Sequence, residues 1–90
     1  MNKKQERFEL IKEREFASKK IGDMLYQLRK AKVWSFEKLS LKTMNDKNEC
    51  VSHETIRLYE SGIGISINKL ESIVLVLGFR NLFQFFKLIK

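Results

Sequence analysis

The chain has 90 residues, 43% of them hydrophobic, which suits one small domain and leaves no room for a second. Charged residues make up 32% of it, and no apolar run approaches the ~18 residues of a membrane span. Its 18 lysines and arginines against 11 aspartates and glutamates give a net charge of +7, which favours an anionic partner, first nucleic acid and then an anionic membrane.

Two features predict a cytoplasmic protein. The start of the chain, Met1–Arg7, is charged and lacks the apolar core of a secretory signal. Cys50 is the single cysteine, so no intrachain disulfide can form, as is usual in a reducing compartment.

Proline is absent and apolar residues recur with helical spacing, so we expect an all-helical fold. The first expected helix covers residues 4–16 and can run on into a second over residues 18–32. The apolar positions of the first are Phe8, Leu10, Ile11 and Phe16, and those of the second are Ile21, Leu25 and Leu28.

Serines mark the starts of the next helices. Ser35 is expected to cap a helix over residues 36–44, and the polar stretch Asn45–Glu49 reads as a loop. Ser52 is expected to cap the following helix, with Glu54 favourably placed in its first turn. That helix should end near Ser61, with Gly62 in the left-handed conformation.

The C-terminal third predicts two more helices. Ser66 is expected to cap the first, which ends at Gly78 and turns Leu70, Ile73, Val74 and Leu77 inward. The last helix, over residues 81–89, is apolar nearly all round. A period of 3.6 places Leu82, Phe86 and Ile89 on a stripe that closes the core, whereas Phe85 and Leu88 fall toward the other side.

From Ile21 to about Phe86, the order of motifs resembles the lambda-repressor-like (Cro and XRE type) helix-turn-helix family. The opening pattern l-G-x-x-I-x-x-L-R matches Ile21–Arg29, and the second-helix start S-x-x-x-L-A matches Ser35–Ser40. The recognition-helix pattern V-S-x-x-x-I-x-x-x-E-x-G matches Val51–Gly62. The downstream pattern S-x-x-x-L-x-x-x-x-x-x-L-G-v matches Ser66, Leu70, Leu77, Gly78 and Phe79.

The resemblance implies a five-helix DNA-binding domain over residues 18–90, whose second and third helices form the helix-turn-helix and whose last helix mediates dimerisation. Residues 1–17 would be an N-terminal helical extension. Two features depart from the family. Asn45–Cys50 look like an insertion of six residues in the turn, and Phe36 stands where the second helix usually carries a DNA-contacting glutamine.

The predicted recognition helix has one inward and one outward face. With Ile56 inward, positions 52, 56, 59 and 63 cluster toward the core. Arg57 would then bind guanine O6/N7 or a phosphate, Glu54 would accept from cytosine N4, and Leu58 would touch a thymine methyl. The hydroxyls of Ser52 and Thr55 suit phosphate oxygens. The complete expected DNA-binding set is Ser52, His53, Glu54, Thr55, Arg57, Leu58, Phe36, Lys38, Lys42 and Lys47.

The remaining candidate residues are expected to have structural roles and no catalytic or metal-binding role. The resemblance pairs Arg29 with Glu60, linking the first and third helices. His53–Arg57 nearly spells the zinc motif H-E-x-x-H, but arginine replaces the second ligand. We therefore expect no catalytic residue, no metal, no cofactor and no small-molecule ligand. The expected dimerisation surface comprises Leu82, Phe83, Phe85, Phe86 and Ile89.

The sequence thus predicts a homodimeric, sequence-specific regulator of transcription that binds double-stranded DNA, acting as a repressor of the phage, mobile-element or controller-protein kind. The alternative is a protein-binding module such as an antitoxin, which grips its partner with the terminal helices. Peripheral membrane attachment through residues 4–16 ranks third, because their apolar face is narrow.

Overall fold

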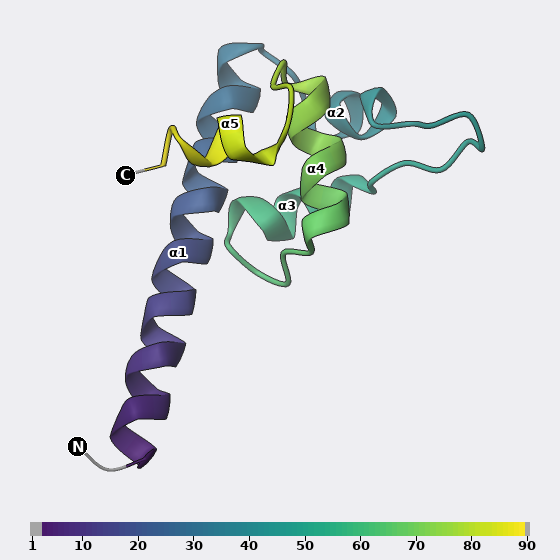
Figure 1. The fold of residues 1–90 in the computed structure, drawn as a ribbon. Helices are drawn as coiled ribbons and strands as arrows, with labels where there is room; N and C mark the ends of the chain where they lie inside the picture. Colours follow the sequence, from purple (N-terminus) through teal and green to yellow (C-terminus); the bar gives the residue numbers. More distant parts are fainter. Residues whose placement is uncertain (1–2, 90) are drawn as a thin grey trace.

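A single long helix begins the fold. In the computed structural model, α1 spans Lys3–Ala31 without a break, so the two helices expected over residues 4–32 are one. The structure describes the backbone of residues 3–89 and the side chains of residues 16–89. Phe8, Leu10 and Ile11, the apolar residues expected to line the first helix, have side chains outside the described residues. Figure 1 shows the N-terminal half of α1 extending away from the other helices.

Four shorter helices gather against the C-terminal half of α1 (Figure 1). They are α2 at Phe36–Lys42, α3 at His53–Glu60, α4 at Ile67–Val76 and α5 at Leu82–Phe86. No strand occurs among residues 3–89, which agrees with the expected all-helical class. None of the described helices is long and apolar enough to cross a membrane.

Each short helix starts at a capping side chain. The hydroxyls of Ser35, Ser52 and Ser66 accept hydrogen bonds from the backbone N–H groups three residues ahead, as predicted. Asn81 caps α5 in the same way. Gly62 has φ 78°, the left-handed conformation expected beyond α3.

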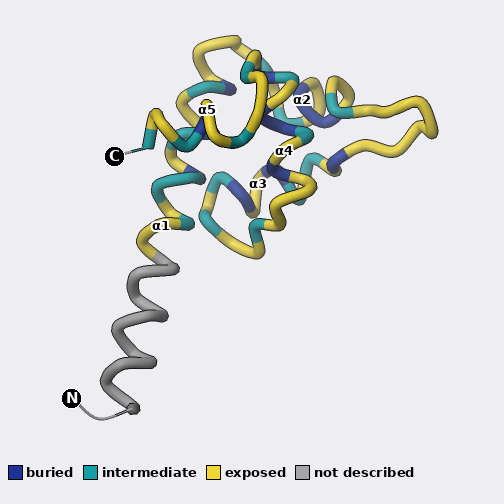
Figure 2. Tube along the Cα trace, viewed as in Figure 1, coloured by how far each residue is buried: buried dark blue, intermediate teal, exposed yellow. Residues whose placement is uncertain are grey.

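The core lies where α1, α2, α3, α4 and α5 meet. Its fully buried side chains include Leu25 of α1, Leu39 of α2 and Ile56 of α3. The predicted inward stripe of α4 is confirmed, because Leu70, Ile73, Val74 and Leu77 are all buried. Figure 2 shows these buried segments facing one another, whereas residues 44–50 of the loop between α2 and α3 are exposed. Each buried aliphatic side chain contributes about 1.5–3 kcal/mol relative to exposure.

Gly22 sets how closely α1 approaches α3. A Cβ atom at this position would lie 2.5 Å from the backbone oxygens of Tyr59 and Glu60. Because neither oxygen can move without shifting α3, only glycine permits this contact.

The predicted orientation of the C-terminal helix is wrong. Phe85, expected on the outer side and in the dimer surface, is fully buried, and its ring meets the edge of Phe79 with centroids 5.6 Å apart. Phe83 is instead the outermost ring, with 77% of its surface exposed. The reason is that Phe85, three residues after Leu82, lies on the same face of the helix as Leu82 and Phe86, whereas Phe83 lies to the side of that face. Leu82, Phe86 and Ile89 are partly buried against the core.

Two residues expected inward on the recognition helix are also exposed. Ser52 serves as the cap outside α3, and Ile63, beyond the end of α3, is 54% exposed. The helical period applies only within α3, which ends at Glu60.

Candidate nucleic-acid interface

Helix α3 presents one buried and one exposed face. Ile56 and Tyr59 are buried, and the Tyr59 hydroxyl accepts a hydrogen bond from the Ser66 N–H at 3.0 Å. This bond ties the end of α3 to the start of α4. On the opposite face Glu54, Arg57 and Leu58 are exposed, as expected from the sequence.

The N-terminal turn of α3 is internally hydrogen-bonded. The Ser52 hydroxyl accepts from the Thr55 N–H at 3.2 Å and lies 2.8 Å from the Thr55 hydroxyl. Ser52 is exposed, whereas Thr55 and His53 are half-buried. Of the predicted contacts at the start of α3, the two hydroxyls are therefore already paired with each other.

A buried ion pair fixes α3 to α1. Arg29 donates two hydrogen bonds to the Glu60 carboxylate, at 2.6 and 3.0 Å, in the pairing that the family resemblance implies. A third hydrogen bond runs from Arg29 to the Trp34 carbonyl at 2.8 Å. Only 5% and 7% of the two side chains are exposed. The hydrogen bond to Glu60 raises the pKa of Arg29 above its ordinary value, so this guanidinium stays charged.

Phe36 connects this ion pair to the exposed face of α3. Its ring centroid lies 4.1 Å from the guanidinium carbon of Arg29 and 5.5 Å from that of Arg57. The ring therefore contacts two cations. The guanidinium of Arg29 is fixed by its hydrogen bond to Glu60, and that of Arg57 is exposed. Cation–π attraction favours both placements. Phe36 thus supports the guanidinium of Arg57 from the neighbouring helix.

Two lysines lie near the Trp34 ring, which precedes α2. The ammonium of Lys32 lies 5.2 Å from its ring centroid and that of Lys42 lies 4.8 Å from it. Tyr26 has a similar neighbour in Lys30, at 5.7 Å. Sequence reasoning found Lys42 but missed the other four residues. Two lysines followed by two aromatic residues at every second position from Lys30 to Phe36 were the signal available to find Lys30, Lys32 and Trp34.

The loop between α2 and α3 is closed at its base and folded at its tip. The Val51 N–H donates to the Thr43 hydroxyl at 2.8 Å, and the Asn45 N–H donates to the Glu49 carbonyl at 2.8 Å. The Asn45 side-chain oxygen accepts from the Lys47 and Glu49 N–H groups. Lys47 is exposed on this loop, which projects beyond α2 and α3 (Figure 1).

The structure brings together part of the predicted DNA-binding set. Arg57 and Phe36 are in contact, and Glu54 and Leu58 share the exposed face of α3. Lys38 is exposed on α2, whereas Lys47 lies on the projecting loop. Within the side chains of residues 16–89, no group of three or more histidine, cysteine, aspartate or glutamate residues is placed to hold a metal.

Comparisons of this chain with protein-family models, with curated proteins and with solved structures find no match.

Proposed function

We propose that this protein binds double-stranded DNA as a homodimer, reads base edges with the exposed face of α3, and so regulates transcription. The observation that carries the proposal is the placement of Arg57. Its guanidinium is exposed on α3 and contacts the Phe36 ring, which in turn contacts the buried Arg29–Glu60 pair. An arginine positioned in this way suits bidentate hydrogen bonding to guanine O6 and N7.

Charge supports the same function. The net charge of +7 attracts a polyanion, and Lys38 and Lys42 are exposed on α2, which packs against α3, with Lys32 exposed in the turn before it. Lysines in such flanking positions suit phosphate oxygens, which orient a protein on DNA without reading sequence. We accordingly assign base reading to Arg57, Glu54 and Leu58. The further assignment as a repressor of the phage or controller-protein kind rests on the motif resemblance alone.

The test is titration of duplex DNA at several salt concentrations, with a random duplex and with a duplex selected from a random pool. We expect affinity to fall as salt rises, because phosphate contacts release counterions. Arg57→Ala should lower affinity for the selected duplex by about 1–3 kcal/mol and leave affinity for random DNA nearly unchanged.

Arg80→Ala is the matched control, because Arg80 is an exposed arginine that precedes α5. It should retain the wild-type preference for the selected duplex. Absence of duplex binding at every salt concentration would refute the proposal. Equal loss of affinity for both duplexes in Arg57→Ala would assign Arg57 to a phosphate instead.

A protein-binding module of the antitoxin kind is the second candidate. The exposed Phe83 ring at the C-terminal end favours it, because a large exposed aromatic side chain often marks a protein interface. The same titration separates the two, since such a module requires no affinity for duplex DNA.

A further inference from the structure

Cations and aromatic rings alternate along a row that joins α1, α2 and α3. The row begins at the Lys30 ammonium, 5.7 Å from the centroid of the Tyr26 ring, and that centroid lies 5.8 Å from the guanidinium carbon of Arg29. Arg29 contacts Phe36 in turn, and Phe36 contacts Arg57. We call these five residues the cation–ring row. Its two ends, Lys30 on α1 and Arg57 on α3, are exposed cations, each next to a ring.

The middle of the cation–ring row is fixed, which limits the distance between its ends. Arg29 is held by hydrogen bonds to the Glu60 carboxylate and to the Trp34 carbonyl. The four contacts of the row measure 4.1–5.8 Å. Its ends therefore lie within about twice the width of a DNA major groove, which is about 12 Å. Because phosphates border that groove, a duplex that offers a base to Arg57 also brings phosphates toward Lys30.

The two ends of the row suit different chemical groups. The guanidinium of Arg57 is a planar fork that can bind two acceptors of one base edge, whereas the ammonium of Lys30 is a compact charge that suits a phosphate oxygen. The surroundings of Lys30 also favour an anion. Between residues 26 and 42 four lysines are exposed, and Glu37 is the single acidic residue. Tyr26 is 49% exposed, so its ring is accessible beside the ammonium.

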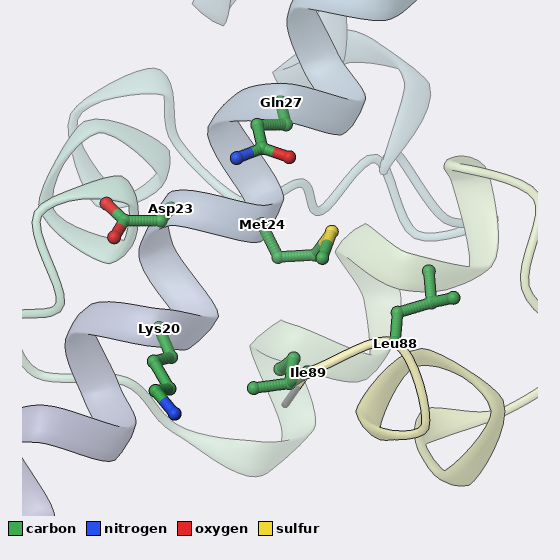
Figure 3. A pocket seen from close by; sticks show the side chains of 6 residues that line it. All are labelled: Lys20, Asp23, Met24, Gln27, Leu88 and Ile89. Atoms are coloured by element: carbon green, nitrogen blue, oxygen red, sulfur yellow. The ribbon is translucent and has the colours of Figure 1, made fainter.

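A hollow further back on α1 is a poorer place for a phosphate. It measures about 160 Å³ and includes Lys20, but Asp23 lines it as well. Figure 3 shows Met24 reaching across this hollow from α1 toward the C-terminal segment of the chain. A carboxylate at the edge opposes the approach of another anion. Lys30 lies seven residues beyond Asp23, or about 10 Å along the helix, so the last turn of α1 is free of this repulsion.

We propose that Lys30, supported by the Tyr26 ring, binds a backbone phosphate of the duplex that Arg57 reads, so that α1 contacts DNA together with α3. The inference rests on the proposed function and adds a contact on a helix outside the helix-turn-helix. Tyr26 is a positioning residue, because its ring lies against the ammonium as Phe36 lies against Arg57. A phosphate contact carries no sequence information, so it adds affinity for any duplex.

Fluorescence anisotropy with a selected and a random duplex, at several salt concentrations, tests the contact. Lys30→Gln should lower affinity for both duplexes equally, about three- to tenfold, and reduce the slope of log affinity against log salt by about 0.9. Lys87→Gln is the matched control, because Lys87 is an exposed lysine at the end of α5 and the same charge is removed. It should change neither. A slope reduced no more by Lys30→Gln than by Lys87→Gln would overturn the proposal.

Uncharged methylphosphonates, placed one at a time in the selected duplex, locate the phosphate. At one position the wild type and Lys87→Gln should lose affinity about three- to tenfold, whereas Lys30→Gln should lose little. The reason is that two changes to the same contact are not additive. If Lys30→Gln loses as much affinity as the wild type at every position, Lys30 binds no phosphate.

The role of Tyr26 is tested by keeping or removing its ring. Tyr26→Ser should lower affinity for both duplexes about two- to fivefold, and Tyr26→Phe should bind as the wild type does. In the Lys30→Gln background, Tyr26→Ser should have no further effect, since the cation that the ring supports is already gone. A further loss in that background would show that Tyr26 acts through the fold and not through Lys30.

The two proposals fail in different ways. Absence of affinity for any duplex would overturn both. Duplex binding that depends on Arg57 but not on Lys30 would leave the proposed function in place and remove the contact on α1.

Discussion

The guanidinium carbon of Arg57 lies 5.5 Å from the centroid of the Phe36 ring. Phe36 therefore contributes to the exposed face of α3 by supporting a side chain that belongs to another helix. The same ring also contacts Arg29, whose guanidinium carbon lies 4.1 Å from the ring centroid. A residue without hydrogen-bonding groups thereby influences how an arginine on the neighbouring helix is placed.

Phe36→Leu should lower affinity for the preferred duplex about two- to fivefold, because an exposed cation–π contact is worth about 0.5–1 kcal/mol. Affinity for random DNA should change little. Phe36→Tyr retains an aromatic face and should behave as the wild type. Fluorescence anisotropy with both duplexes measures the difference, and wild-type affinity in the leucine variant would show that the ring does not position Arg57.

Glu60→Ala should destabilise the fold by about 3–5 kcal/mol, because it leaves the Arg29 charge buried without its carboxylate partner. The double substitution Arg29→Met with Glu60→Leu should cost less than the single one. Urea denaturation of the three proteins gives the free energies of unfolding. A double variant as unstable as Glu60→Ala would contradict the buried-charge explanation.

Arg29 should not make stability depend on pH near neutrality. Because the hydrogen bond to Glu60 raises the pKa of Arg29, the stabilisation linked to its protonation is complete below the unfolded pKa. It is lost only as pH rises through the still higher folded value. Between about pH 6 and about pH 9, Arg29 should therefore contribute no slope to the free energy of unfolding.

Gly22→Ala should destabilise the fold by about 3 kcal/mol, since the added Cβ would meet two backbone oxygens of α3. Gly64 provides the control. It has φ +64° but open space around it, so Gly64→Ala carries only the backbone penalty, about 1–2 kcal/mol. Thermal and urea unfolding compare the two, and a smaller loss at position 22 would mean that α1 and α3 separate easily.

Phe85→Ala should cost about 3–5 kcal/mol of stability, whereas Phe83→Ala should change it by less than about 0.5 kcal/mol. The reason is their opposite placement, with Phe85 fully buried and Phe83 77% exposed. Chemical denaturation of both variants distinguishes them. The reverse order would mean that α5 is rotated relative to the core.

Trp34 is the single tryptophan, and Lys32 and Lys42 lie within 5.2 Å of its ring centroid. Phosphates that attract these lysines should change the fluorescence of the ring when duplex DNA binds. Lys42→Gln should also reduce the slope of log affinity against log salt by about 0.9. Unchanged fluorescence at saturating DNA would place this side of α2 outside the contact.

Features that depend on residues close together in the sequence were predicted better than features that depend on packing between elements. The caps Ser35, Ser52 and Ser66 were predictable because each bonds to a backbone group three residues away. The orientation of α5 was predicted wrongly, because neighbouring rings at positions 85 and 86 both lie on the face of Leu82, and the full burial of Phe85 depends on its contact with Phe79.

In the candidate interface, too, features within one helix were predictable from the sequence and contacts between helices were not. Periodicity within α3 predicted the exposed Arg57 and the buried Ile56. The contact of Phe36 with Arg29 and Arg57 joins three helices and follows from their packing, so spacing along one segment could not reveal it.

The hydrogen bond between the Val51 N–H and the Thr43 hydroxyl joins the end of α2 to the approach to α3. This hydrogen bond joins the two ends of the loop directly, and the loop residues between them, 44–50, are exposed. The spacing of the two helices therefore does not depend on the number of residues in the loop. Insertions and deletions at its tip, around Asp46 to Asn48, should be tolerated, so this position is suitable for a peptide tag that leaves both helices in register.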